Sequence, residues 1–166
     1  YGENIGAGLT VSGTIGAAME AATAGIPALA VSMQTTPEYH FSLSREIDFS
    51  AAGYFTRIIA QKMLEKKMPE DVDLIKIDVP VGATQETPWV LTRQSRYRHY
   101  FPVPTERKYV SEKGPVGYEI RHDPERTEKD SDIFTIMVEK KVSVTPISID
   151  LTSRTDFDAL RELLSS

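Results

Sequence analysis

The 166 residues are enough for one domain with a substantial hydrophobic core, and a content of 40% hydrophobic and 26% charged residues argues against disorder. The formal net charge of −5 gives no general attraction to nucleic acid or to an anionic membrane, so we expect neither as a partner. Cysteine is absent, which excludes disulfides, thiol nucleophiles and cysteine-based zinc sites and is compatible with the reducing cytoplasm, where we expect the protein to act.

The opening stretch GENIGAGLTVSGTIGAAMEAATAGIPALAVS predicts a glycine-rich loop, a Ser-Gly-Thr turn, a small-residue helix and a buried strand over 28–32. Ser12 occupies the N-cap position of that helix and Thr14 its first turn. Free N–H groups with hydroxyls beside them suit a phosphate. On the residues alone, a serine that only caps the helix is the more common arrangement, so both readings stay open.

A glycine-rich loop that feeds a helix normally follows a strand, whereas this chain enters the loop directly at Tyr1. We therefore expect it to be the later part of a longer protein. Further on, three- and four-residue apolar spacing predicts a helix over 42–67, which ends before Pro69. In the strand expected over 73–79, three apolar side chains alternate with Lys76 and Asp78, which we assign to a wetter face. The order helix, strand, helix, strand predicts a doubly wound α/β fold with a mostly parallel sheet.

The pattern changes after Pro80. Short β-prone segments at 89–93, 97–103, 108–110 and 118–120 predict an antiparallel extension that includes a long hairpin. We expect strands over 133–138 and 142–151, the second of them with a bulge or break at Thr145-Pro146, and a closing amphipathic helix over 156–164.

The histidines and the arginines are the remaining candidates for a functional role. The histidines at 40, 99 and 122 have no metal-ligand spacing, and we predict surface or loop positions for them. Arg93, Arg96 and Arg98 alternate with aromatic residues, as in a surface that stacks a base and neutralises a phosphate. The alternative, which a net charge of −5 favours, is that these arginines pair with acidic loops or a neighbouring subunit.

The run NIGAGLTVSGTIGAAMEAATAGIPALAVS resembles the SurE family (survival protein E), metal-dependent 5′/3′-nucleotidases and acid phosphatases. IKIDVP, LTRQSRYRHY, SDIF and VSVTPISIDLT continue the resemblance in the same order, most firmly over 1–33 and 142–152. It implies a Rossmann-like sheet with antiparallel hairpin extensions. Residues 1–80 would form the C-terminal half of the phosphatase core. Residues 81–166 would form a hairpin and oligomerisation extension, followed by a strand and helix that return to the core.

The resemblance also implies roles for individual residues. Ser12, Gly13 and Thr14 match the family's phosphate-holding Ser-Gly-Thr, and Asn4 matches an asparagine that lines the site. Asp132 matches an aspartate that closes over the site, whereas Arg96 and Arg98 become interface or substrate-rim residues.

The family's divalent metal, Mg²⁺ or Mn²⁺, is held by an Asp-Asp-Gly turn, a serine and an asparagine that we expect upstream of residue 1. The implied function is metal-dependent hydrolysis of nucleoside monophosphates by a complete protein that is a homodimer or homotetramer, with this chain alone inactive. The alternative is a non-catalytic nucleotide-binding or assembly module.

Overall fold

The computed structural model describes residues 2–40, 44, 46–109, 111–114 and 117–165. Its centre is a four-stranded sheet in the order β1-β2-β6-β3. β1 (Ala28–Met33) runs parallel to β2 (Leu74–Val79), β2 runs antiparallel to β6 (Val142–Ile147), and β6 runs parallel to β3 (Trp89–Leu91). The chain is therefore an α/β protein with a mostly parallel sheet, as predicted.

The two longer helices of the first half cover opposite faces of this sheet. After the 3-10 turn η1 (Ala7–Val11), α1 (Gly13–Thr23) packs with Ala30, Leu74 and Ile147. Beyond a second 3-10 turn, η2 (Pro37–Tyr39), α2 (Ser50–Glu65) packs with Ile77 and Val144. Leu74 and Ile77 are three residues apart in β2, so their side chains point to opposite faces of the sheet. One strand therefore contributes to both layers of the core.

Helix α2 begins later than the predicted residue 42. Residues 41–43 and 45 lie outside the described part of the chain, and residues 46–49 are not helical. The Asp48 carboxylate accepts a hydrogen bond from the backbone N of Ser50 at 2.8 Å, and a local bond of this kind satisfies one of the free N–H groups at the helix start.

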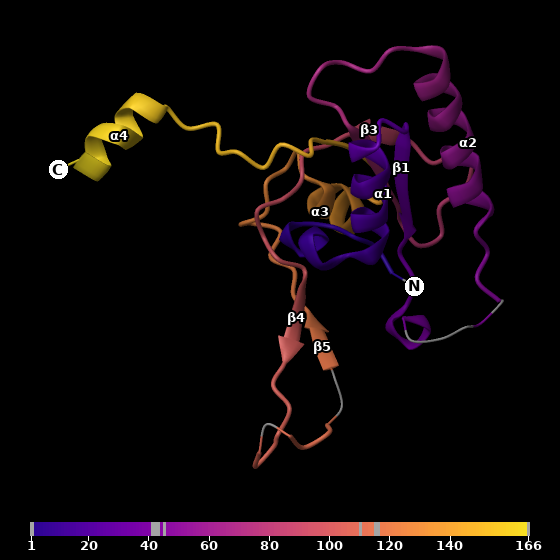
Figure 1. The fold of residues 1–166 in the computed structure, drawn as a ribbon. Helices are drawn as coiled ribbons and strands as arrows, with labels where there is room; N and C mark the ends of the chain where they lie inside the picture. Colours follow the sequence, from indigo (N-terminus) through magenta and orange to yellow (C-terminus); the bar gives the residue numbers. More distant parts are fainter. Residues whose placement is uncertain (1, 41–43, 45, 110, 115–116, 166) are drawn as a thin grey trace.

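The antiparallel extension is smaller than expected. β4 (Tyr100–Val103) and β5 (Gly117–Ile120) form a hairpin that projects from the body of the protein (Figure 1). The segment at 89–93 was wrongly assigned to this extension, because β3 pairs in parallel with β6 in the main sheet. Residues 108 and 109 form a bend instead of a strand, and Val110 lies outside the described residues.

The expected break at Thr145-Pro146 is absent from β6, which pairs continuously with β2 through Thr145↔Lys76 and Pro146↔Ile75. β3 ends opposite Val144, so Pro146 has a neighbouring strand on one side only. A missing N–H is tolerated at such an edge position.

The predicted strand over 133–138 is wrong. The segment is helical, as α3 (Asp132–Phe134) followed by the π-helical turn η3 (Thr135–Glu139). The Ser131 hydroxyl caps α3 by accepting from Phe134 N at 3.2 Å. In this conformation Ile133 and Ile136 face one cluster with Ile5, which an extended chain would have split between two faces.

The last helix, α4 (Phe157–Ser165), confirms the helix predicted near the C-terminus and lies at the end of an extended arm (Figure 1). Its apolar residues, Phe157, Leu160, Leu163 and Leu164, are exposed. Within the described residues, no helix combines the length and the apolar character needed to cross a membrane.

Candidate active site

A cavity of about 430 Å³ lies between the opening loop and the hairpin. We call it the loop–hairpin cavity. Its loop side is formed by Glu3, Asn4, Ile5, Gly8, Val11 and Ser12, and its hairpin side by Arg98, Tyr100, Pro102, Gly117 and Tyr118. The fold therefore brings together three of the site residues expected from the sequence: Asn4, Ser12 and Arg98.

The N-terminus of α1 adjoins this cavity through Ser12. Ser12 is the N-cap, with extended backbone, and its Oγ accepts a hydrogen bond from Ile15 N at 3.3 Å. Gly13 and Thr14 follow in the first turn and are exposed. The capping reading of Ser12 is thus correct, and the same residue also lines a cavity toward which a helix N-terminus contributes positive potential.

Asn4 is held in place by two contacts from the sheet. Its backbone N donates to Asp78 Oδ1 at 2.7 Å, and its side-chain Nδ2 donates to Ser32 Oγ at 2.5 Å. Ser32 and Asp78 are register partners on β1 and β2, so their side chains point to the same face of the sheet. The end of the parallel β1–β2 pair therefore fixes both the backbone and the side chain of Asn4.

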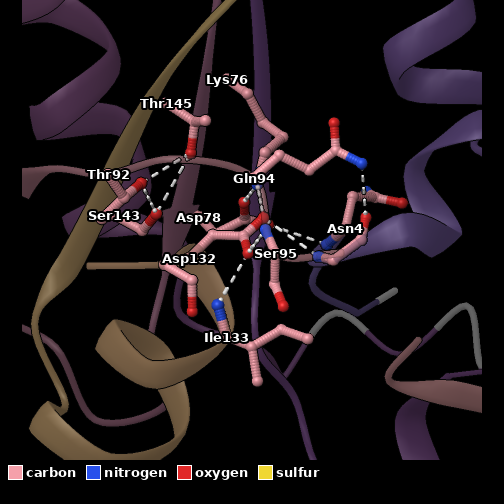
Figure 2. Close-up of polar contacts among 12 residues, drawn as sticks. Asn4, Lys76, Asp78, Thr92, Gln94, Ser95, Asp132, Ile133, Ser143 and Thr145 are labelled. Atoms are coloured by element: carbon pink, nitrogen blue, oxygen red, sulfur yellow. Dashed lines mark hydrogen bonds and ion pairs between the residues drawn. The ribbon is translucent and has the colours of Figure 1, made fainter. Parts of the chain in front are cut away.

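Lys76 lies at the centre of a buried polar network beneath the opening loop (Figure 2). Its ammonium contacts Asp78 and lies 2.9 Å from Asp132 Oδ2, and all three side chains are fully buried. Burial alone would lower the Lys76 pKa, but the charges of the two carboxylates outweigh it and raise that pKa, so the side chain stays charged.

The assignment of Lys76 and Asp78 to a wetter face is therefore wrong. The alternation itself is correct, because Ile77 packs under α2 while Lys76 and Asp78 point to the opposite face. The opening loop and the start of α3 cover that face. Backbone N–H groups of the loop and the Asp132 carboxylate of α3 take the place of solvent there.

Asp132 fastens the loop from below instead of lining the cavity. Its Oδ2 accepts from Gly6 N at 3.0 Å and from Lys76, and its Oδ1 accepts from Ser95 N at 2.9 Å and from Ile133 N at 2.8 Å. Gly6 has φ 64°, and a Cβ at this position would lie 2.3 Å from the carbonyl oxygen of Tyr97. Only glycine can make this approach between the loop and the hairpin base.

A row of hydroxyls extends the buried network across the sheet. Thr92 Oγ1 lies 2.8 Å from both Ser143 Oγ and Thr145 Oγ1, and all three residues are buried (Figure 2). Ser143 and Thr145 are the β6 partners of Asp78 and Lys76. These hydroxyls satisfy one another, which supports a structural role for them.

Glu3 and His99 form a second buried pair, beside the cavity. Glu3 Oε1 lies 3.2 Å from His99 Nε2, and Gln34 Nε2 donates to the same oxygen at 3.3 Å. Glu3 is 4% exposed and His99 is fully buried, so His99 lies in a loop, as one of the two predicted alternatives has it, but not at the surface. Burial pushes the Glu3 pKa upward, but hydrogen bonding and charge from His99 more than offset this and lower that pKa.

The arginines predicted as one cluster are separated. Arg98 lines the cavity and forms an isolated bridge with Gly6. Arg96 is exposed, and its backbone N donates to Glu128. Arg93 pairs with Asp130 at 2.8 Å on the surface, as the electrostatic alternative anticipated. Of the three, only Arg98 reaches the cavity.

The described residues do not form a metal site by themselves. Among them, no group of three or more histidine or acidic side chains is arranged to hold an ion. Asp78 and Asp132 already bind Lys76 and backbone N–H groups, so these two carboxylates are not available as metal ligands.

Sequence reasoning missed Glu3, Lys76, Asp78 and His99 as neighbours of the site. An acidic and a basic residue inside an apolar strand pattern, as in IKID, was the signal available for two of them.

Comparison with known proteins gives a consistent result. The family described as "Survival protein SurE" matches residues 1–100. The chain is 40% identical over 164 residues to "5'-nucleotidase SurE" of Thermococcus gammatolerans, a match over 98% of this chain and 60% of the relative. The protein of the same name from Thermococcus kodakarensis is 39% identical, with 98% of this chain and 62% of the relative covered.

Among solved structures, the "Crystal Structure of Sure Protein from Aquifex aeolicus" matches with a TM-score of 0.64 and 26% identity. That match covers 98% of this chain and 62% of the other. The chain thus spans about 60% of the length of the curated relatives.

Proposed function

The chain belongs to the survival protein SurE family, and we propose that the protein of which it is part is a phosphomonoesterase that hydrolyses nucleoside monophosphates. The relatives' name, "5'-nucleotidase SurE", supports this reaction class. The observation that carries the proposal is the loop–hairpin cavity, where the N-cap of α1 and Asn4 face Arg98 and the tyrosines of the hairpin. Positive potential at one side and aromatic surface at the other suit a phosphate joined to a nucleoside.

In this proposal the phosphoryl group lies at the start of α1. Ser12 and Thr14 offer hydroxyls, and the first-turn N–H groups, including that of Gly13, offset charge that develops on the phosphoryl oxygens. Arg98 contributes a guanidinium from the opposite wall, and Asn4 orients the substrate from its fixed position. The nucleoside part lies against Tyr100 and Tyr118.

We further propose that hydrolysis depends on Mg²⁺ or Mn²⁺, as the family resemblance implies. The described residues do not fit such an ion on their own, so no catalytic step is assigned to it. The required oxygen donors would come from outside the part of the chain that the structure describes.

We also propose a cytoplasmic homodimer or homotetramer. The exposed apolar residues Phe157, Leu160 and Leu164 of α4 support self-association, because an exposed apolar helix face is typical of an interaction surface. Light scattering during size-exclusion chromatography of the full-length protein measures the oligomer directly, and a monomer at micromolar concentration would contradict this proposal.

The deciding experiment measures phosphate release from AMP and from a generic aryl phosphate by the full-length protein, with Mg²⁺, with Mn²⁺ and with EDTA. We expect metal-dependent release that Thr14→Val reduces strongly. Thr23→Val, at the exposed far end of the same helix, is the matched control and should leave release unchanged. Binding of AMP without release under any condition would support the non-catalytic nucleotide-binding module instead.

A further inference from the structure

A second cavity, of about 220 Å³, lies where the chain enters and leaves the hairpin. We call it the arginine pocket. Three arginines, one histidine and two aromatic residues line most of it: Arg98, Arg121, Arg126, His122, Tyr97 and Phe101. Among the described residues, Arg98 is the only one that lines both this pocket and the loop–hairpin cavity. The arginine pocket is therefore a neighbour of the candidate active site and is separate from it.

The lining of this pocket is positively charged, although the whole chain carries a formal net charge of −5. Its one carboxylate, Asp123, accepts a hydrogen bond from the backbone N of Arg126 at 3.3 Å. Arg121 forms an ion pair with Glu119. Within the described part of the chain, the guanidinium groups of Arg98 and Arg126 have no carboxylate partner. These two cations are therefore available to an anion.

Aromatic rings hold two of the guanidinium groups in place. Cζ of Arg126 lies 5.8 Å from the centroid of the Tyr97 ring, and Cζ of Arg121 lies 4.5 Å from the centroid of the Phe101 ring. Such stacking attracts the cation to the face of the ring and leaves N–H groups at its edge able to donate. The turn at Asp123 also fixes the backbone of Arg126. The pocket therefore presents donors that are already positioned, which reduces the entropy lost when a ligand binds.

His122 supplies the observation that points to a ligand. Both of its ring nitrogens are buried, and neither has a hydrogen-bond partner among the residues that the structure describes. Burial and the charges of His99 and Lys140 lower the pKa of this side chain against an opposing effect of Asp123, so the ring is neutral at pH 7. A neutral imidazole offers one donor and one acceptor, and buried polar groups without partners are rare. Inorganic phosphate can bind whichever nitrogen faces the pocket, because it has both acceptor oxygens and a donor hydroxyl.

We propose that the arginine pocket binds inorganic phosphate at a site separate from the loop–hairpin cavity. Its volume of 220 Å³, against 430 Å³ for that cavity, is below the usual range for organic ligands and suits a small ion. Because Arg98 lines both cavities, phosphate in the pocket competes for its guanidinium with the phosphoryl group of a substrate. This competition rests on the proposed function, and by linkage each ligand weakens the binding of the other.

The test titrates inorganic phosphate into the full-length protein and follows the imidazole NMR signals of His122, which His122→Gln identifies by their loss. Ser12→Asp is titrated in parallel, because it places a negative charge at the proposed substrate site. We expect a saturable shift with similar affinity in both proteins. Arg126→Gln should weaken this affinity about tenfold or more, since it removes a charged donor. Arg57→Gln is the matched control and should keep the affinity, because Arg57 also stacks on a ring, that of Tyr54, but lies outside the pocket.

Three results would overturn the proposal. One is a His122 signal that does not respond to phosphate, as would follow if a second copy of the chain covered the pocket. Another is a shift that sodium chloride reproduces at equal ionic strength, which would show general screening in place of a site. The third is equal weakening by Arg126→Gln and Arg57→Gln. These readouts need no turnover, so their failure leaves the proposed function intact, and a protein that releases no phosphate from AMP leaves the binding result intact.

Kinetics of the active protein test the competition for Arg98. In buffer without phosphate, Arg126→Gln should leave kcat/KM for AMP unchanged, because Arg126 lies outside the loop–hairpin cavity. Added phosphate should raise the KM for AMP less in Arg126→Gln than in the wild type, where both cavities bind the ion. An equal rise in KM in the two proteins would overturn the competition.

Discussion

Lys76 and Asp132 are 56 residues apart in the chain, yet Nζ of the lysine lies 2.9 Å from Oδ2 of the aspartate and neither side chain is exposed. Burial of such a pair carries a large desolvation free energy. Removal of one partner destabilises the protein still more, because it leaves a buried charge without compensation.

Replacement of Lys76 should therefore have a large effect on stability. We expect Lys76→Met to lower the free energy of unfolding by about 3–5 kcal/mol, because Asp78 and Asp132 would remain buried together. The matched control is Arg93→Met, which removes an exposed ion pair with Asp130 and should cost no more than about 1 kcal/mol. Urea titration of both variants measures the difference, and equal losses would contradict the prediction.

Gly6 should not tolerate a side chain. An alanine Cβ would meet the Tyr97 carbonyl at 2.3 Å and Ile133 Cδ1 at 2.6 Å, at a positive φ that disfavours other residues. Because the nearest atom belongs to the backbone, we expect Gly6→Ala to destabilise by at least about 1–3 kcal/mol. At Gly8, two residues further along the chain, no atom lies within 4 Å of the new Cβ, so Gly8→Ala should leave stability nearly unchanged. Thermal melts of the two variants measure the difference.

Variants of Ser12 can separate its capping role from phosphate binding. Ser12→Ala removes the cap and should cost about 1 kcal/mol of stability. Ser12→Asp keeps the cap, since aspartate is an equally good N-cap residue, but places a negative charge where the proposal puts phosphate. We expect near-wild-type thermal stability with strongly reduced phosphate release for Ser12→Asp. Full activity of this variant would remove Ser12 from the proposed site.

The buried pair of Glu3 and His99 predicts a loss of stability in acid. The Glu3 pKa is lowered in the folded protein below its ordinary value of 4.5. Its contribution is therefore complete above pH 4.5 and is lost as the pH falls through the lower folded value. Glu3→Gln, which has no titrating group, should show a shallower decline of stability across this acid range. Chemical denaturation at a series of pH values tests this, and identical slopes for wild type and variant would refute it.

Much of the fold was readable from local pattern. The serine cap and small residues after Ser12 located α1, and the apolar runs located β1 and β2 to within a residue of their observed limits. The helical character of 133–138 was also encoded, by the Ser131 cap and by the spacing of Ile133, Ile136 and Met137, but the apolar run alone suggested a strand.

The candidate site was less predictable, because its neighbours are decided by tertiary contacts. A lysine and an aspartate at alternate positions are normally solvated, and only the loop and α3 packed above β2 reverse that expectation for Lys76 and Asp78. The burial of His99 likewise depends on Glu3, which lies 96 residues earlier in the chain. The phosphate-binding roles of Ser12, Gly13 and Thr14 and the role of Asn4 remain predictions.

The anchoring of the opening loop also has a consequence for biosynthesis. The contact from Asn4 to Asp78 spans 74 residues, and the contact from Gly6 to Asp132 spans 126. A nascent chain therefore exposes its glycine-rich loop to the ribosome exit and to proteases long before the residues that fasten it have been translated. The opening loop is among the earliest parts of this segment to be made, yet its contact with Asp132 can form only after a further 126 residues have been translated.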